Sequence, residues 1–166
     1  MRAQAVVGTR KGLFFLERGA QGFRLVRAAF EGDNVPMVLR DPRDGAVYAV
    51  LNHGHFGVKL HKSTDEGRTW AEVAAPAYPP KPEGLVDVDP FRGTPLEWTL
   101  ELIWSLEIGA PHERGTLWAG TIPGGLFRSE DGGQSWALLR SLWDHPDRKR
   151  WSGGGMDRAC IHTIMV

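Results

Sequence analysis

Two eight-residue segments of this 166-residue chain share the pattern Ser-x-Asp-x-Gly-x-(Thr/Ser)-Trp. The first segment covers residues 63–70 and the second covers residues 129–136. Two ordinary polar turns could match by coincidence, but a repeated structural unit explains the shared positions better. The residues that carry the pattern are Ser63, Asp65, Gly67, Trp70, Ser129, Asp131, Gly133 and Trp136.

Each position of the pattern suits a tight turn between two β-strands. Glycine adopts a positive φ without steric cost, which hairpin turns require. The aspartate can accept hydrogen bonds from backbone N–H groups further along the turn, and the serine can add a weaker bond of this kind. The tryptophan can then place a large apolar ring beneath the hairpin. We therefore expect these residues to have structural roles.

The composition favours an all-β protein without an obvious charged partner. The chain has 21 glycines and seven tryptophans, and its short apolar runs are separated by turn-forming residues. Twenty basic and twenty acidic residues balance, so we expect neither nucleic acid nor a membrane surface as a partner. The single cysteine, Cys160, and the lack of a secretory signal predict a cytoplasmic location.

Strand-like segments recur around the two turns, and we read them as β-propeller blades of four antiparallel strands. In each blade an inner strand A precedes two middle strands, B and C, and the repeated turn joins strand C to the outer strand D. The first blade lacks strand A, and Phe23 stands where the other two blades have tryptophan. The expected blades cover about residues 3–28, 35–75 and 99–141, with a strand A of a fourth blade at about 160–166.

About three blades cannot close a propeller ring, which needs roughly four to eight. We therefore read residues 1–166 as a single partial propeller, the N-terminal part of a longer protein. The alternative is that several copies associate through open blade edges.

The antiparallel order of the strands separates the loops into two groups. The repeated C–D turns lie at one end of each blade, and the B–C and D–A loops lie at the other. Most of the unusual side chains fall in the second group, and loops on a rigid scaffold commonly form binding sites. The candidate ligand-binding residues are Arg10, His53, His55, Trp143, Asp144, His145, Trp151, Arg158 and His162.

Three interpretations of these candidates remain open. In the first, the histidines hydrogen-bond the backbone of their own loops. Alternatively, Trp143 and Trp151 stack on a small molecule or carbohydrate while arginine or histidine holds its polar groups. The third possibility is a divalent metal bound by His53 and His55, with another histidine or Asp144 completing the site.

The repeated pattern resembles the Asp-box, or BNR repeat, and the chain as a whole resembles WD40/YVTN/BNR-like repeat propellers of the sialidase and glycosyl hydrolase superfamily. The resemblance implies a propeller fold over nearly all 166 residues. It also implies an arginine-containing (Phe/Tyr)-Arg-Ile-Pro motif, which this sequence lacks. For this reason we transfer the fold and no catalytic residues.

Two functions follow from these observations. The first is a propeller scaffold that binds a ligand or a protein through its B–C and D–A loops, with no activity of its own in this fragment. The second is a sialidase-like or other glycoside hydrolase when the protein is full length. Hydrolysis would need two carboxyl groups about 5–10 Å apart, for which Asp33, Asp144 and Asp157 are the available candidates.

Overall fold

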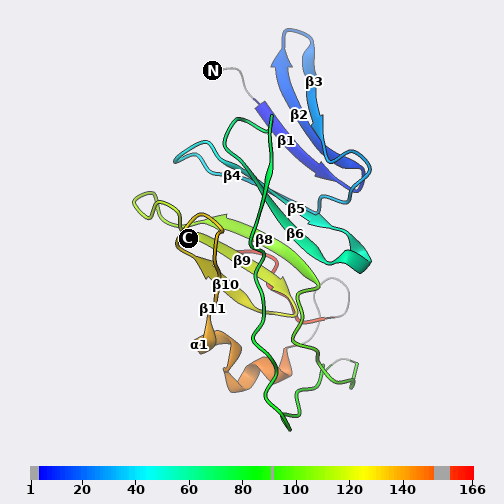
Figure 1. The fold of residues 1–166 in the computed structure, drawn as a ribbon, viewed down its shortest axis with the longest axis vertical. Coiled ribbons are helices and arrows are strands. Elements are labelled where there is room, and N and C mark those ends of the chain that lie inside the picture. The colour runs from blue at the N-terminus through cyan, green and yellow to red at the C-terminus, as the bar shows by residue number, and fades with distance from the viewer. Residues whose placement is uncertain (1–3, 91, 152–157) are drawn as a thin grey trace. The chain divides into compact units, whose positions relative to one another are not determined.

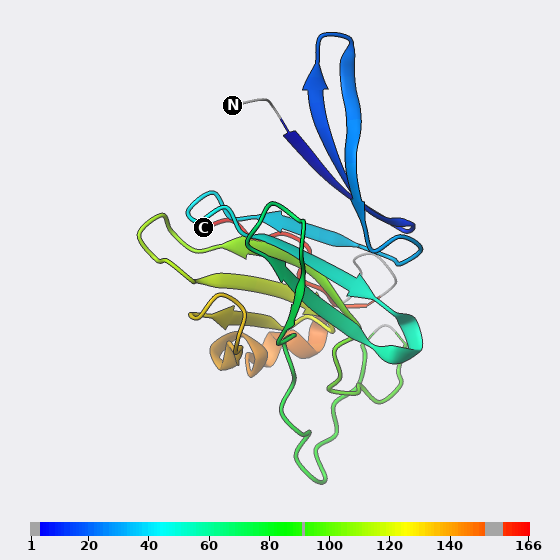
Figure 2. The ribbon, with the colours of Figure 1, turned by 45° about the horizontal axis from the view of Figure 1, so that its top comes forward.

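A computed structural model describes residues 4–90, 92–151 and 158–166. The chain forms two compact units, Met1–Val73 (unit 1) and Ala74–Val166 (unit 2). The described residues carry three antiparallel sheets, each with its strands in up-and-down order (Figures 1 and 2). The predicted all-β class with blades of the β-propeller type is therefore confirmed.

Unit 1 contains two of the sheets. The first has three strands and the second has four, in sequence order. The strands are β1 (Gln4–Thr9), β2 (Gly12–Gly19), β3 (Gly22–Ala29), β4 (Met37–Arg40), β5 (Val47–Asn52), β6 (Val58–Ser63) and β7 (Ala71–Val73). A short 3₁₀ helix, η1 (Gly54–Phe56), interrupts the connection between β5 and β6. Within the described residues, the first sheet thus has one strand fewer than the second.

The core of unit 1 forms where its two sheets meet. Leu13 and Phe15 of β2 pack in one cluster with Ala49 and Leu51 of β5, and Val35 of the connecting loop joins them. Burying these side chains removes apolar surface from water, which is the main force that stabilises the unit. The loop is also fixed by its backbone, because Val35 N donates to Thr9 O at 2.7 Å.

Unit 2 contains the third sheet and most of the irregular chain. Its strands are β8 (Leu102–Ile108), β9 (Leu117–Ile122), β10 (Leu126–Ser129) and β11 (Ala137–Leu138), paired in sequence order. Tyr78, from the long segment before β8, packs edge-on against Phe127 of β10 and tilts against Trp143. The Tyr78 hydroxyl donates to Pro123 O at 2.5 Å, which fastens this segment to the sheet.

Short helices follow the third sheet. The segment after β11 contains α1 (Arg140–Trp143) and η2 (Pro146–Arg150). Residues 160–166 form no strand in the structure, and Ile161 N donates to Thr121 O at 3.2 Å. A strand needs a paired neighbour, and the fourth blade that would supply one stays a prediction.

The expected turn of the first blade is only partly realised. Gly19 and Gly22 pair across a tight β2–β3 turn, and Gly22 has a φ of 111°. Phe23, however, is 58% exposed, so it does not cover the hairpin as a buried ring. Within the described residues, no helix is long and apolar enough to cross a membrane.

Candidate functional site

The two repeated turns form the same hydrogen-bonded structure. In the first, Asp65 Oδ1 accepts from the N–H groups of Arg68 and Thr69 at 3.0 and 2.9 Å, and Ser63 Oγ accepts from Gly67 N at 2.8 Å. In the second, Asp131 Oδ1 accepts from Gln134 N and Ser135 N at 2.8 and 2.9 Å. Ser129 Oγ correspondingly accepts from Gly133 N at 2.9 Å.

The electrostatics of the turns agree with a structural role. The backbone and hydroxyl donors of Thr69 hold the pKa of Asp65 well below its ordinary value. Those of Ser135 lower the pKa of Asp131 to about 2. A carboxylate whose lone pairs are occupied in this way is poorly suited to exchange protons with a substrate.

The tryptophans of the turns contact different partners. Trp70 packs on the core of unit 1, with its ring centroid 4.9 Å from that of Phe30. Trp136 instead donates from its indole Nε1 to Ala74 O at 2.8 Å, within unit 2. Both indoles are partly buried, and both help to fix the end of a blade.

A groove in unit 2 brings together three of the predicted site residues. It has a volume of about 400 Å³, within the size range of ligand pockets. One wall comes from the segment before β8, and the other comes from α1, η2 and the residue pair between them. The groove is lined by Pro82, Leu85, Asp87, Trp98, Arg140, Trp143, Asp144, His145, Pro146, Arg148 and Lys149. We refer to this feature as the unit 2 groove.

A buried ion pair joins the two walls of the unit 2 groove. Arg148 Nη2 donates to Asp87 Oδ2 at 2.7 Å, and the Asp87 side chain is 1% exposed. Trp98 Nε1 donates to the same carboxylate oxygen at 2.9 Å. The Arg148 guanidinium also lies 4.0 Å from the centre of the Trp143 ring, and its Nε donates to Trp143 O. These contacts hold both walls in one arrangement.

Trp143 is a buried residue of unit 2 and is not a surface side chain. It is 1% exposed and packs edge-on against Trp98, with Leu96 in the same cluster. One of the three open interpretations used Trp143 as a stacking platform for a ligand, and its ring is buried. Its position at the end of α1 turns it toward the core.

The rim of the groove is charged and exposed. Arg140 Nε donates to Asp144 Oδ2 at 2.8 Å across one helical turn. His145 is the N-terminal cap of η2, and its Nδ1 accepts from Asp147 N at 3.2 Å. For His145, this contact matches the interpretation that a loop histidine hydrogen-bonds its own backbone. Lys149 is exposed beside these residues.

An apolar strip lies on the same segment as one wall of the groove. Leu85, Val86 and Val88 are 37%, 77% and 38% exposed, and they flank the buried Asp87. Alternation of exposed apolar side chains with a buried aspartate is unusual, because apolar residues normally take the buried positions. Exposed apolar side chains that are held in place commonly mark contact surfaces for proteins.

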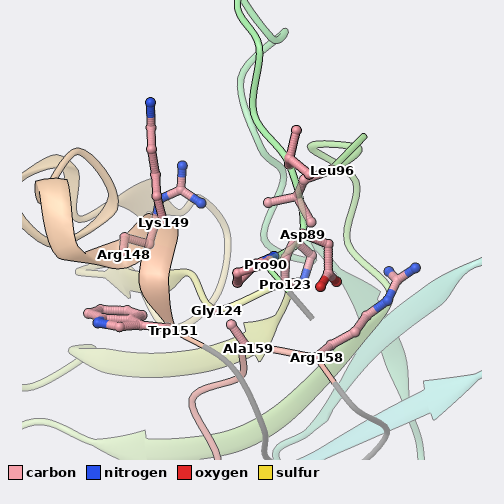
Figure 3. A pocket seen from close by; sticks show the side chains of 11 residues that line it. Asp89, Pro90, Leu96, Pro123, Gly124, Arg148, Lys149, Trp151, Arg158 and Ala159 are labelled. Carbon is pink, nitrogen blue, oxygen red and sulfur yellow. The ribbon is translucent and has the colours of Figure 1, made fainter. Parts of the chain in front are cut away.

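A second, much smaller cavity lies beside Gly124 in unit 2 (Figure 3). Trp151 and Arg158 approach Gly124 from opposite sides, and Lys149 points away from it. The Arg158 guanidinium pairs with Glu101. The cavity has a volume of about 20 Å³, which is room for roughly one water molecule. As it stands, it does not admit a larger ligand.

The remaining candidates are spread over both units. Arg10 is exposed in unit 1, in the β1–β2 turn. His162 is exposed in unit 2, with its Nδ1 2.9 Å from Thr163 Oγ1. Asp157 lies outside the described residues.

The metal interpretation of His53 and His55 finds no support in the geometry. An extended strand would place both imidazoles on one side, but residues 54–56 form the 3₁₀ helix η1. His53 Nδ1 faces Asp33 Oδ1 at 3.7 Å, whereas His55 is exposed and lies edge-on to Phe56. Within the described ranges, no three histidine, cysteine or acidic side chains are grouped as metal ligands.

Sequence reasoning missed the residues that organise the unit 2 groove, chiefly Asp87 and Arg148. Two signals were present. Leu139, Leu142 and Trp143 have the spacing of one face of a helical turn. Pro146 follows His145 as a first helical residue follows its cap.

Comparisons with known proteins add little beyond the fold. No protein-family model matches the sequence, and no curated protein matches it. A similar solved structure, "YCF48 bound to D1 peptide", is 17% identical with a TM-score of 0.48. The match covers 84% of this chain and 37% of that chain, so this chain spans less than two thirds of its length.

Proposed function

We propose that this chain is a binding module whose unit 2 groove holds an extended segment of a protein partner. The groove is formed by the two D–A connections of unit 2, which are the loops that the sequence analysis associated with binding. The observation that carries the proposal is the apolar strip of Leu85, Val86 and Val88, held beside the groove by the buried Asp87.

The walls of the groove are already fixed in the free protein. This favours binding because they lose little conformational entropy when a partner docks. Asp87 connects to Arg148 and Trp98 by hydrogen bonds, so the segment that carries the strip is already fixed. Preorganisation of this kind reduces the entropy lost when a partner docks. The charged rim of Arg140, Asp144 and Lys149 offers polar contacts in addition to the apolar strip, and protein interfaces commonly combine the two.

The groove favours a peptide over a carbohydrate. Sugars typically stack on exposed aromatic faces, but Trp98 and Trp143 are both buried. A hydrolase would also need a carboxyl group kept protonated near neutral pH. Within the described residues, the carboxyl groups of Asp41, Asp65, Glu72 and Asp131 have lowered pKa values, which is opposite to this requirement. We therefore place the proposed role in binding.

A displayed library of random 12-residue peptides, selected against the full chain, tests this proposal. We expect enriched sequences that bind the wild-type protein, measured by fluorescence anisotropy of the labelled peptides. The Val86→Asp variant should bind them about tenfold more weakly, since a charge replaces a contact in the apolar strip.

The matched control is Phe23→Asp, which alters an exposed apolar side chain of β3 in unit 1. This variant should bind the selected peptides as the wild-type protein does. Circular dichroism should show that both variants retain the wild-type fold. Failure to enrich any peptide, or equal affinity for the wild-type protein and Val86→Asp, would contradict the proposal.

A further inference from the structure

A second pocket, in unit 1, has a different chemistry from the unit 2 groove. It has a volume of about 320 Å³ and lies between the loop after β3 and the loop that contains η1. The two loops are joined by a backbone hydrogen bond from Asn52 N to Asn34 O at 2.9 Å. The pocket is lined by Phe30, Asp33, Leu51, His53, Phe56, Lys59, His61 and Glu72.

Aromatic rings form much of this pocket. Phe30 packs edge-on against His61, with ring centroids 5.1 Å apart, and Phe30 also packs on the unit 1 core. Phe56 stands at the rim and is 83% exposed. An aromatic ring that is this exposed leaves a large apolar surface in contact with water in the free protein. A ligand that covers the ring removes this surface from water, which is favourable.

The charges around the pocket leave one carboxylate available. Lys59 Nζ donates to Glu72 Oε1 at 2.8 Å, so these two charges offset each other. Asp33 is 40% exposed, and its contact with His53 Nδ1 at 3.7 Å is longer than a hydrogen bond. Within the described residues, no hydrogen bond is recorded to the Asp33 carboxylate.

The inner wall of the pocket does not repel a cation. Burial lowers the pKa of His61, which outweighs the opposite effect of Glu72. The His61 imidazole is therefore uncharged at neutral pH. A positive ligand group would meet aromatic faces and the partly exposed Asp33 carboxylate at the same place.

We infer that this pocket binds a guanidinium group, the side chain of an arginine presented by a partner. Its planar face would stack on Phe56, and its fork of N–H donors would engage the two oxygens of Asp33. Arginine suits such a site better than lysine, because it is flat, more weakly hydrated and able to donate two parallel hydrogen bonds. The inference concerns unit 1 and is independent of the groove in unit 2.

Titration with N-acetyl-L-argininamide, followed by NMR of the intact chain, tests the inference. We expect saturable shifts in the His53, His61 and Phe56 signals, with a dissociation constant on the order of 1 mM for a single side chain. N-acetyl-citrullinamide has the same shape without the charge and should bind at least fivefold more weakly. N-acetyl-lysinamide should also bind more weakly.

Variants separate this site from general surface effects. Phe56→Ala and Asp33→Asn should each weaken argininamide binding at least fivefold. Lys59→Gln should tighten it, because the substitution removes the positive charge that offsets Glu72. The matched controls Phe23→Ala and Glu66→Gln alter an exposed ring and an exposed carboxylate elsewhere in unit 1 and should leave it unchanged.

Equal binding of the arginine and citrulline probes would overturn the inference, as would an unchanged affinity in Phe56→Ala. The inference would also be overturned if no NMR signal shifted at probe concentrations up to 50-fold above the expected dissociation constant of about 1 mM. Equal binding of the lysine probe would overturn the assignment to guanidinium. None of these results depends on whether the unit 2 groove binds peptides.

Discussion

Arg148 and Asp87 lie 61 positions apart in the chain, and their side chains meet at 2.7 Å in the interior of unit 2. This ion pair connects the segment before β8 to the helical segment after β11. Because both side chains are almost fully buried, neither can exchange its partner for water. The shape of the unit 2 groove therefore depends on this contact.

Replacing Arg148 with methionine should destabilise unit 2 strongly. The substitution leaves the Asp87 carboxylate buried without its charged partner, which typically costs about 3–5 kcal/mol. Urea unfolding, monitored by tryptophan fluorescence, measures the change. The double variant Asp87→Leu/Arg148→Met should be more stable than Arg148→Met, since it removes both charges together.

The exposed pair of Arg140 and Asp144 provides the comparison. Asp144→Ala breaks a contact of similar length on the surface, and it should cost at most about 1 kcal/mol. A loss of stability in Asp144→Ala as large as that in Arg148→Met would show that burial of the ion pair is not what matters.

Gly67 should tolerate alanine less well than Gly45 does. Both have φ values near 80°, so alanine at either position adopts a strained backbone at a cost of about 1–2 kcal/mol. At Gly67 a Cβ would also lie 2.2 Å from Phe15 Cζ, whereas at Gly45 nothing lies within 4 Å. We expect the clash to add about 1–3 kcal/mol.

Thermal unfolding of the two alanine variants measures this difference. Phe15→Leu/Gly67→Ala should recover part of the loss, because the smaller side chain gives the new methyl group space. Equal midpoints for Gly45→Ala and Gly67→Ala would contradict the packing of Phe15 on the repeated turn.

The aspartates of the repeated turns should make stability depend on acid pH. The pKa of Asp131 is about 2 in the folded chain and close to 3.8 when unfolded, because the turn donates hydrogen bonds to the carboxylate. Its contribution is complete above the unfolded value and is lost as the pH falls toward 2. Asp131→Ala should lower the unfolding midpoint at pH 7 and reduce the acid dependence.

Gln134→Ala is the control for this prediction. Gln134 contributes its backbone N–H to Asp131, and alanine retains that group. If Gln134→Ala and Asp131→Ala changed stability equally at pH 7, the carboxylate would not be the group that holds the turn.

His61 should also make the folded chain less stable on acidification, but the cause is burial of its imidazole and not hydrogen bonding. Burial beside Phe30 lowers its folded pKa below 6.5, with Glu72 and Asp33 opposing the shift and His53 and Lys59 adding to it. Below about pH 6.5 the unfolded chain binds more protons at this position, so stability falls on acidification.

An NMR pH titration of the imidazole signals tests this directly. The His61 midpoint should lie below 6.5, the ordinary value for histidine. His61→Phe should flatten the fall in stability between pH 7 and pH 5. A His61 midpoint at or above 6.5 would contradict its burial.

The strands of this chain could be predicted from sequence because their signals are local. Apolar runs such as β5 stand between turn residues, and the paired glycines and aspartates of the repeated turns mark where the chain reverses. The sequence also predicts that the first blade lacks strand A. The prediction comes from the number of strand-like runs that precede strand A of the second blade.

The proposed binding surfaces could not be predicted as fully, because they depend on contacts between distant residues. The burial of Trp143 depends on Trp98, and the exposure of Val86 depends on the position that Arg148 gives to Asp87. A short helical segment such as α1 also has a weak sequence signal, and the packing around it decides whether it forms.

Hydrogen–deuterium exchange of the full chain, with and without a peptide selected from the displayed library, tests the central claim most directly. We predict slower exchange in residues 82–98 and 139–151, the two walls of the unit 2 groove, with the largest effect around Val86. Protection confined to unit 1, or protection of unit 2 that is unchanged in the Val86→Asp variant, would contradict it.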